Sequence, residues 1–277
     1  MCIRDRCRAV PAGRALLTAP SFQEYENALE AADHSCEFLY LKEENDFILP
    51  LQELLLKITE ETSLVFLCNP GNPTGTVTGK AELVRLAERC EETKTFLCVD
   101  ECFLPFLPGE PALSMKGETV RFPHLAVLRA FTKVYGMPGL RLGYLMTGNR
   151  ELAGRLKEKL PPWNVSLPAQ LAGAAALKAE GYLEKTRELI RGEKEKLVSL
   201  LLETVADRVY PGSANFLLFH GREGLKEALL DRKILIRDCS NFKGLSRGYY
   251  RICIRTQEEN ERLKEILYSL AGKEAGK

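Results

Sequence analysis

The stretch RAFTKVYGMPGLRLGY, Arg129–Tyr144, joins a short apolar run to a turn rich in glycine and proline. Lys133 comes directly after Thr132, and Arg141 stands eight residues later. Most lysines are solvated surface charges. Lys133, however, is expected at the C-terminal end of the strand LAVLRAF, at the sheet edge where ligands of open α/β folds bind. Because a lysine in such a cleft loses its proton more easily than in water, Lys133 is a candidate nucleophile toward a carbonyl group.

The composition is that of a globular protein that binds small molecules. The 277 residues are 45% hydrophobic, and 39 Lys and Arg nearly cancel 38 Asp and Glu. No net field therefore recruits nucleic acid or an anionic membrane surface, and a small-molecule substrate is the predicted partner. No apolar run approaches the roughly 20 residues that cross a bilayer.

The cysteines and histidines indicate a reducing compartment and no metal site. Nine cysteines are scattered along the chain, several of them inside apolar runs such as TFLCVDECF, where a thiol packs like a small hydrophobe. They form no CxxC pair, and the three histidines are isolated, so the spacing typical of metal ligands is absent. We therefore predict a cytoplasmic protein without a metal.

Short apolar runs alternate with amphipathic stretches in the first part of the chain. The stretch Gly79–Glu92 is typical of an amphipathic helix, and the alternation predicts an α/β fold with a mostly parallel sheet. Because the runs are apolar throughout, the strands are expected to be buried on both faces. The predicted strands are ALLTAP, CEFLYL, SLVFLCNP, TFLCVDECF, LAVLRAF and LRLGYLMTG.

The pattern changes after PPWNVSLPAQ. A helix of small residues (169–179) and a long charged helix (182–202) precede the strands ANFLLFH, ILIRDC and YYRICIR, and Thr256 is a plausible N-cap for a last helix. This predicts a large domain over residues 14–164 and a small α+β domain over residues 165–277. The opening MCIRDR resembles a translated sequencing-adaptor remnant and is left out of the fold prediction.

Asp100 ends the apolar run TFLCVD. An acid in this place can simply cap the next helix. The other interpretation is that its carboxylate faces a cationic ring nitrogen, because pyridoxal phosphate is an electron sink only while a carboxylate keeps its pyridinium protonated. An acid and a lysine at neighbouring strand ends suit that cofactor.

The motif NPGNPTG, Asn69–Gly75, directly follows the run SLVFLC and has the composition of a tight turn. In the functional interpretation, the amide of Asn72 reaches the phenolic oxygen of the cofactor. The guanidinium of Arg141 and the hydroxyl of Thr132 then hold the cofactor phosphate. Each of these signals is weak when taken alone.

In order and spacing, these motifs resemble the aminotransferase class I/II family of fold-type I pyridoxal phosphate enzymes. The resemblance is carried by NPGNPTG, by Asp100 at a strand end, by TKVYGMPGLRLGY and by YYRICIRT, and it runs from about Arg14 to the C-terminus. It implies the fold-type I architecture, pyridoxal phosphate as the cofactor, and a homodimer with the active site at the subunit interface.

The resemblance also implies roles for single residues. Lys133 would form a Schiff base with the cofactor, and Asp100 would pair with its pyridine nitrogen. Asn72 would bind the phenolic oxygen and contact the substrate, while Thr132 and Arg141 would hold the phosphate.

Two further positions complete the implied site. Phe22 of APSFQEY falls where an aromatic ring stacks on the cofactor, and Arg251 of YYRICIRT falls where the family binds the substrate α-carboxylate. Arginine suits that place because its guanidinium binds a carboxylate through two hydrogen bonds. The alternative for Arg251 is an outward charge on a strand. Two residues depart from the family pattern: Phe103 replaces a tyrosine that also bonds the phenolic oxygen, and Ala130 replaces a hydroxyl residue near the phosphate.

Within the family, the chain is most similar to the branch that decarboxylates L-threonine O-3-phosphate to (R)-1-aminopropan-2-ol phosphate in cobalamin biosynthesis. The residues that carry this similarity are LIRDCSNFKGL, RICIRTQEEN, PPWNVSLPAQ and Phe103. Arg237 and Arg255 are candidate partners of the substrate phosphate. Histidinol-phosphate amino transfer is the alternative reaction, and a non-catalytic regulator that binds the cofactor is a third interpretation.

Family members begin with an N-terminal arm and a helix that carries a phosphate-binding turn, and the sequence before RALLTAP resembles neither. Backbone N–H groups at such a helix start bind phosphate well. The hypothesis that follows is a large domain truncated at its N-terminus, and a fragment that is itself inactive.

Overall fold

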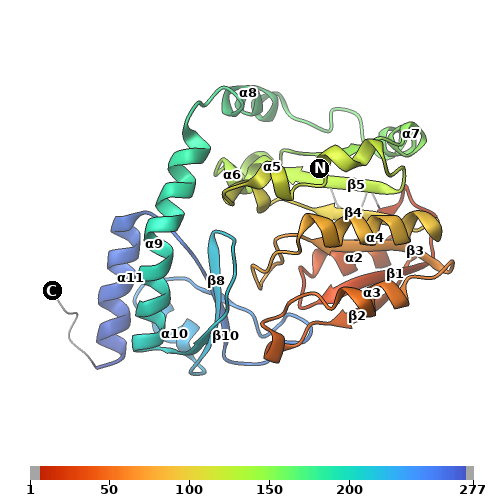
Figure 1. The fold of residues 1–277 in the computed structure, drawn as a ribbon. Helices are drawn as coiled ribbons and strands as arrows, with labels where there is room; N and C mark the ends of the chain where they lie inside the picture. Colours follow the sequence, from red (N-terminus) through yellow and green to blue (C-terminus); the bar gives the residue numbers. More distant parts are fainter. Residues whose placement is uncertain (1–6, 273–277) are drawn as a thin grey trace.

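The structure is a computed structural model that describes residues 7–272 and contains two β-sheets (Figure 1). Six strands between residues 14 and 147 form the larger sheet, and four later strands form the smaller one. The opening MCIRDR lies outside the described residues. The predicted α/β class with a mostly parallel large sheet is confirmed.

The larger sheet has the strand order β2-β1-β3-β4-β5-β6. Neighbouring strands pair in parallel, except β5 and β6, which are antiparallel. All six strands lie where the sequence predicted them. They are β1 (Arg14–Ala19), β2 (Ser35–Tyr40), β3 (Thr62–Cys68), β4 (Phe96–Asp100), β5 (Leu125–Ala130) and β6 (Gly143–Thr147).

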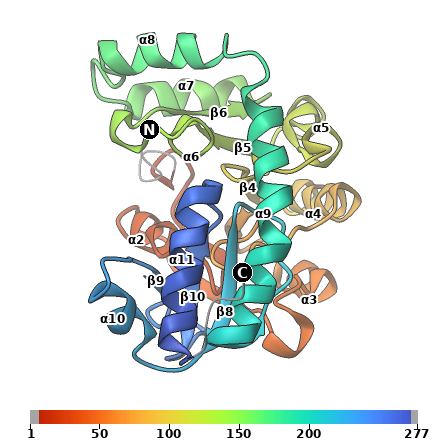
Figure 2. The same cartoon turned by 90° about the vertical axis from the view of Figure 1, so that its left-hand side faces the viewer.

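Helices cover both faces of the larger sheet. Helix α2 (Glu24–Glu30) lies on one face, and α3 (Leu51–Lys57) and α4 (Lys80–Glu92) lie on the other (Figure 2). Successive strand residues alternate between the two cores, so that Leu17 packs with α2 whereas Leu16 packs with α3 and α4. The predicted burial on both faces is confirmed for the four inner strands, β1, β3, β4 and β5, and explains why they are apolar throughout. It is wrong for β2 and β6, which lie at the edges of the sheet and are only partly buried.

Short helices connect the remaining strands of the larger sheet. Apart from α7 (Arg150–Lys159), a ten-residue amphipathic helix after β6 that the sequence analysis missed, none of these segments has the length or periodicity that would reveal it in the sequence. The others are η1 (Glu43–Asn45), η2 (Leu104–Phe106), α5 (Glu110–Leu113), η3 (Lys116–Val120), α6 (Phe131–Val134) and η4 (Pro138–Leu140).

The smaller sheet is antiparallel, with the order β7-β8-β10-β9. We propose that the domain boundary lies near residue 165, in the segment between α7 and α8. The strands are β7 (Ala206–Val209), which the sequence analysis missed, β8 (Phe216–Gly221), β9 (Arg237–Asp238) and β10 (Tyr249–Cys253). The helices are α8 (Leu167–Ala176), α9 (Tyr182–Thr204), α10 (Leu225–Leu230) and α11 (Gln257–Leu270).

Helices α9 and α11 run side by side along one face of the smaller sheet (Figures 1 and 2). Leu201 of α9 and Leu267 of α11 belong to the same apolar core as Phe219 of β8. Thr256 caps α11 as predicted, and its hydroxyl accepts a hydrogen bond from the backbone N–H of Glu259. Among the helices of residues 7–272, none combines the length and the apolar character that crossing a lipid bilayer requires.

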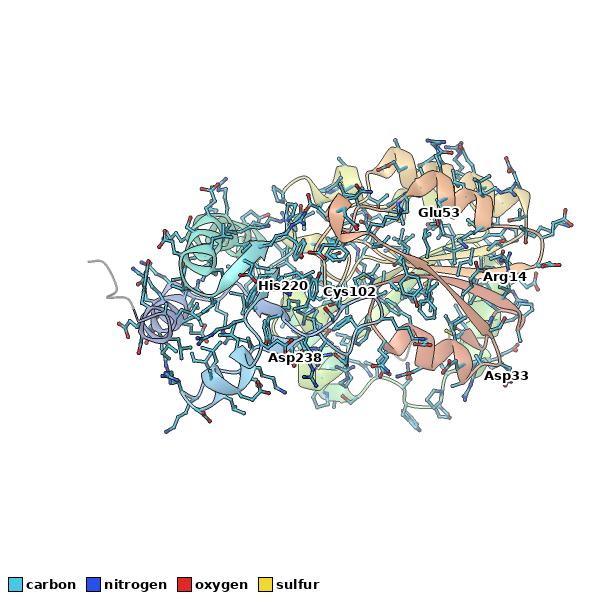
Figure 3. All side chains as sticks on the ribbon, turned by 90° about the horizontal axis from the view of Figure 1, so that it is seen from below. Arg14, Asp33, Glu53, Cys102, His220 and Asp238 are labelled. Carbon is cyan, nitrogen blue, oxygen red and sulfur yellow. The ribbon has the colours of Figure 1, made fainter. Side chains whose placement is uncertain are left out.

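The C-terminal ends of the parallel strands face the smaller sheet. Cys102, two residues after β4, lies between the two sheets in Figure 3, whereas Arg14, at the start of β1, lies at the opposite end of the larger sheet. On the same side as Cys102, Glu43 in the loop after β2 accepts hydrogen bonds from the hydroxyls of Tyr210 and Tyr249. The two sheets therefore meet at the edge where open α/β folds bind ligands.

Candidate active site

A cavity of about 240 Å³ lies where β4 and β5 end opposite β10 of the smaller sheet. Its walls include every residue to which the sequence analysis gave a part in binding the cofactor or the substrate carboxylate. These residues are Phe22, Asn72, Asp100, Thr132, Lys133, Arg141 and Arg251. The fold thus brings together side chains that are far apart in the sequence.

Lys133 stands in α6, the single helical turn that begins directly after β5. The ring of Phe131 is buried at the start of this turn, so the next two residues, Thr132 and Lys133, reach the cavity. The side chain of Lys133 is exposed, and its Nζ makes no hydrogen bond or ion pair with any group of residues 7–272. This amine is available to a carbonyl compound in the cavity.

Asp100 is the last residue of β4, and its side chain is buried. The hydroxyl of Tyr25 donates to its Oδ2 at 2.8 Å, and the backbone N–H of Cys102 donates to its Oδ1 at 2.9 Å. Burial, followed by the nearby Asp100 carboxylate, raises the pKa of Tyr25 well above its usual value, so the hydroxyl keeps its proton. Each oxygen of this carboxylate therefore has one donor from the protein.

Arg251 reaches the cavity from β10 and meets Asn72 there. Its Nη1 donates to Oδ1 of Asn72, and its guanidinium lies 4.8 Å from the centre of the Phe216 ring. Burial lowers the pKa of Arg251. Its Nε is buried and has no hydrogen-bond partner among residues 7–272. A guanidinium with an unused buried donor is ready to bind an anion.

The NPGNPTG turn that carries Asn72 is held by its own hydrogen bonds. The side chain of Asn69 accepts from the N–H of Thr78 at 2.8 Å and donates to the carbonyl of Thr78 at 3.1 Å. Gly75 has a φ of 73°, and a Cβ at this position would lie 2.9 Å from Cα of Gly212. The final glycine of the motif thus allows the close contact between the turn and the smaller sheet.

The other predicted residues lie around the rim of the cavity. Arg141 has the left-handed backbone φ of 55° and donates from Nη1 to the carbonyl of Pro138 at 2.9 Å. The ring of Phe22 is 39% exposed and packs edge-on against Tyr25, with 5.6 Å between ring centres. Both side chains have enough exposed surface to contact a ligand.

A larger, basic groove adjoins the cavity at Arg251, which lines both. Arg237 of β9 is directly opposite Arg251 in the antiparallel pairing, so both side chains leave the same face of the sheet. Neither guanidinium makes an ion pair with a carboxylate of residues 7–272, whereas Arg255, the other predicted candidate, is paired with Glu259. The structure therefore favours Arg237 over Arg255 as a second cation beside the cavity.

Residues 5–267 match the protein family described as Aminotransferase class I and II. The chain belongs to this family. Threonine-phosphate decarboxylase of Salmonella typhimurium is 38% identical to this class I/II chain over 263 residues, which are 92% of this chain and 70% of that protein.

Solved structures of two other members have the same fold as this class I/II chain. The histidinol-phosphate aminotransferase from Clostridium acetobutylicum superposes with a TM-score of 0.91 at 30% identity, over 98% of this chain and 80% of the other. The L-threonine-O-3-phosphate decarboxylase from Porphyromonas gingivalis superposes with a TM-score of 0.83 at 25% identity, over 98% and 81%. The predicted fold-type I architecture is thereby confirmed.

Pyridoxal phosphate is the cofactor of the class I/II family, and the residues of the cavity fit it. A carboxylate with both oxygens hydrogen-bonded, Asp100, suits a cationic ring nitrogen, and an unpaired lysine amine, Lys133, suits the cofactor aldehyde. Thr132 and Arg141 offer a hydroxyl and a guanidinium to the phosphate. In this arrangement Asn72 and Phe22 are the groups that would hold the ring.

The two departures from the family pattern have clear surroundings. Phe103 packs edge-on against Phe216, with 5.1 Å between ring centres, so it supplies an apolar wall beside the guanidinium of Arg251. Ala130, the last residue of β5, lines the cavity and offers no hydroxyl to it.

Three residues beside the cavity were missed by the sequence analysis. Tyr25 contacts Asp100 across 75 positions of the chain, and no local pattern announces such a contact. Glu101 is fully buried and accepts from Nε and Nη2 of Arg129 at 3.0 and 2.7 Å. Burial alone would lower the pKa of Arg129, but Glu101 and Glu110 outweigh it and raise that pKa. The charged Arg129 within the otherwise apolar run LAVLRA was the signal in the sequence that could have revealed this ion pair.

Proposed function

We propose that this chain carries the catalytic core of a decarboxylase that converts L-threonine O-3-phosphate into (R)-1-aminopropan-2-ol phosphate and CO2 in cobalamin biosynthesis. The observation that carries the proposal is the pair of guanidiniums of Arg251 and Arg237, opposite each other and without carboxylate partners among the described residues. Like charges directly opposite each other destabilise a sheet, so the pair suits a ligand with two anionic groups. Threonine phosphate has two, a carboxylate and a phosphate.

The chemical step is the exchange of one bond at the α-carbon for another. The bond to the carboxylate breaks, CO2 leaves, and a proton takes its place. Pyridoxal phosphate, when bound, supplies an electron sink for the negative charge that develops at this carbon. We assign to Asp100 the role of keeping the ring nitrogen protonated, and to Nζ of Lys133 the delivery of the proton after CO2 has left.

Arg251 has to orient the carboxylate and not merely attract it. The bond that breaks would be the one that the protein aligns with the electron sink, so a decarboxylase would have to align the bond to the carboxylate, and an aminotransferase the bond to the α-proton. Asn72 and Phe216 restrain the guanidinium from two sides. A misplacement of about 1 Å at such a site costs on the order of 100-fold in rate.

The similarity to the Salmonella decarboxylase and the apolar residue at Phe103 support decarboxylation over amino transfer. The alternative is histidinol-phosphate amino transfer, which the close superposition on the Clostridium aminotransferase favours. We further propose that the protein acts as a homodimer in the cytoplasm.

The test is to saturate the protein with pyridoxal phosphate and then to supply either substrate set. One sample receives threonine phosphate, and the other receives histidinol phosphate with 2-oxoglutarate. We expect CO2 release in the first sample and no glutamate in the second. Glutamate formation without CO2 would replace the proposal by the aminotransferase alternative, and no turnover with bound cofactor would favour the non-catalytic regulator.

A further inference from the structure

The hydroxyl of Tyr25 stands out among the groups that line the cavity, because no role has been assigned to it. Tyr25 is only 2% exposed, and its hydroxyl donates to the carboxylate of Asp100 at 2.8 Å. Both residues line the cavity. The carboxylate is thus held on one side by the protein and is open to a ligand on the other.

The ring of Tyr25 is clamped in place by two neighbours. It stacks on Phe66 of β3, with ring centres 4.2 Å apart and planes 27° apart. It also packs against the edge of Phe22, with planes 86° apart. Because the ring cannot swing away, the hydroxyl stays directed at Asp100.

The remaining oxygen of Asp100 is fixed by the backbone. The N–H of Cys102 donates to Oδ1, so the two donors together fix the plane of the carboxylate. Hydrogen bonds to an ionised acceptor are shorter and about twice as strong as those between neutral groups. Removal of one of them leaves a buried charge with less compensation.

We propose that Tyr25 is a positioning residue that sets the strength of the contact between Asp100 and the ring nitrogen of the cofactor, while its ring fixes the place of Phe22. The inference rests on the role proposed for Asp100. It does not depend on whether the enzyme decarboxylates or transfers an amino group.

The decisive variant is Tyr25→Phe, which keeps the ring and its stacking and removes only the hydroxyl. A matched control is Tyr210→Phe, because Tyr210 is also buried and donates to a carboxylate, that of Glu43, away from the cavity. Asp100→Asn and the double variant Tyr25→Phe, Asp100→Asn complete the set. For each protein, the affinity for pyridoxal phosphate is measured by titration. The bound cofactor absorbs at roughly 410 to 430 nm, and the pH midpoint at which half of this absorption is lost is measured as well.

In Tyr25→Phe we expect about tenfold weaker cofactor binding and an upward shift of the pH midpoint. A carboxylate that has lost a hydrogen-bond donor stabilises the positive charge on the ring nitrogen less well. With less positive charge on the ring, the Schiff-base nitrogen of Lys133 keeps its proton to higher pH, so the midpoint rises. Asp100→Asn should cause a larger change in the same direction, and Tyr25→Phe should add little to it. Tyr210→Phe should leave both quantities at the wild-type values.

Two results would overturn the inference. The first is a Tyr25→Phe protein with wild-type affinity and midpoint although Asp100→Asn changes both, which would leave the role of Asp100 intact. The second is an effect of Tyr25→Phe that is equally large in the Asp100→Asn background, since the hydroxyl would then act elsewhere. If Asp100→Asn itself changes neither quantity, the role proposed for Asp100 fails together with the inference.

Discussion

The two walls of the cavity are built in different ways. On the larger sheet, Asp100 ends a strand that is buried on both faces, both of its oxygens have donors, and the Glu101–Arg129 ion pair ties β4 to β5. On the smaller sheet, Arg251 has a buried Nε without a partner among residues 7–272 and stands next to the two-residue edge strand β9. Around Asp100 the wall has its hydrogen bonds within the protein already made, whereas around Arg251 the wall has a buried donor left for a ligand.

This difference suggests that the two walls have different functions. Chemistry that all reactions of the cofactor share belongs on the rigid wall, where the hydrogen bonds are already made. Choice of substrate belongs on the wall with unused cations, since those groups distinguish between anions. Variants of the two walls should therefore change different quantities, which are the binding and chemistry of the cofactor for one wall and KM for the substrate for the other.

The largest effect is expected on the rigid wall, from Lys133→Ala. Loss of the amine should remove the absorption band of the bound cofactor and lower the turnover rate by roughly 10²- to 10⁴-fold. Absorption spectra and steady-state rates measure both effects. Lys159→Ala, at the end of α7, is the control and should behave as wild type. A Lys133→Ala protein that keeps the band would show that another lysine bonds the cofactor.

The next largest effect is expected from Glu101→Gln, which breaks the buried pair with Arg129. Removing one partner of a buried ion pair costs up to about 3–5 kcal/mol of unfolding free energy when the other charge is left without compensation. Because Arg129 keeps Glu110 as a second partner, we expect a loss of about 2–3 kcal/mol. Urea unfolding measures the loss. The matched control is Glu88→Gln, in an exposed pair with Arg121, and its expected loss is below about 1 kcal/mol. Equal losses in the two variants would contradict the special part given to the buried pair.

On the smaller-sheet wall, Arg251→Lys should weaken the substrate and spare the cofactor. A lysine keeps the charge but cannot donate two parallel hydrogen bonds, so we expect KM for threonine phosphate to rise by about 10- to 100-fold. The affinity for pyridoxal phosphate should stay within about twofold of wild type, because Arg251 itself is assigned no hydrogen bond to the cofactor and acts on it only through Asn72. A variant that loses cofactor affinity but keeps its KM would reverse the functions proposed for the two walls.

The smallest effect is expected behind the smaller sheet, from Thr256→Ala at the start of α11. The hydroxyl caps this helix, and its removal should cost about 1 kcal/mol of unfolding free energy. Cofactor affinity and KM should not change, since Thr256 lines neither the cavity nor the adjoining basic groove. A measurable change in either would mean that the walls are coupled through α11.

The strands of the larger sheet could be predicted because each is a continuous apolar run between turn residues. The positions of Lys133, Asp100 and Asn72 could be predicted because Asp100 ends such a run and the other two stand in the turns that follow one. The sequence did not reveal strands of very few residues or contacts between residues that are far apart in the chain. Strand β9 has two residues, although the run ILIRDC suggested more.

Contacts between distant segments were equally beyond the sequence. The hydrogen bond from Tyr25 to Asp100 and the contact of Arg251 with Asn72 depend on how two sheets meet, which no periodicity records. The sequence also suggested two cations for the substrate phosphate, and Arg237 is distinguished from Arg255 by the register of β9 with β10 and by the ion pair of Arg255 with Glu259.

The most direct test of the account is to locate the lysine that bonds the cofactor. The protein is saturated with pyridoxal phosphate, reduced with borohydride to make the bond permanent, digested and mapped by mass spectrometry. We predict a single pyridoxyl adduct, on Lys133, and none on Lys133→Ala. An adduct on another lysine, or none on a protein that binds the cofactor, would contradict the assignment of this cavity as the active site.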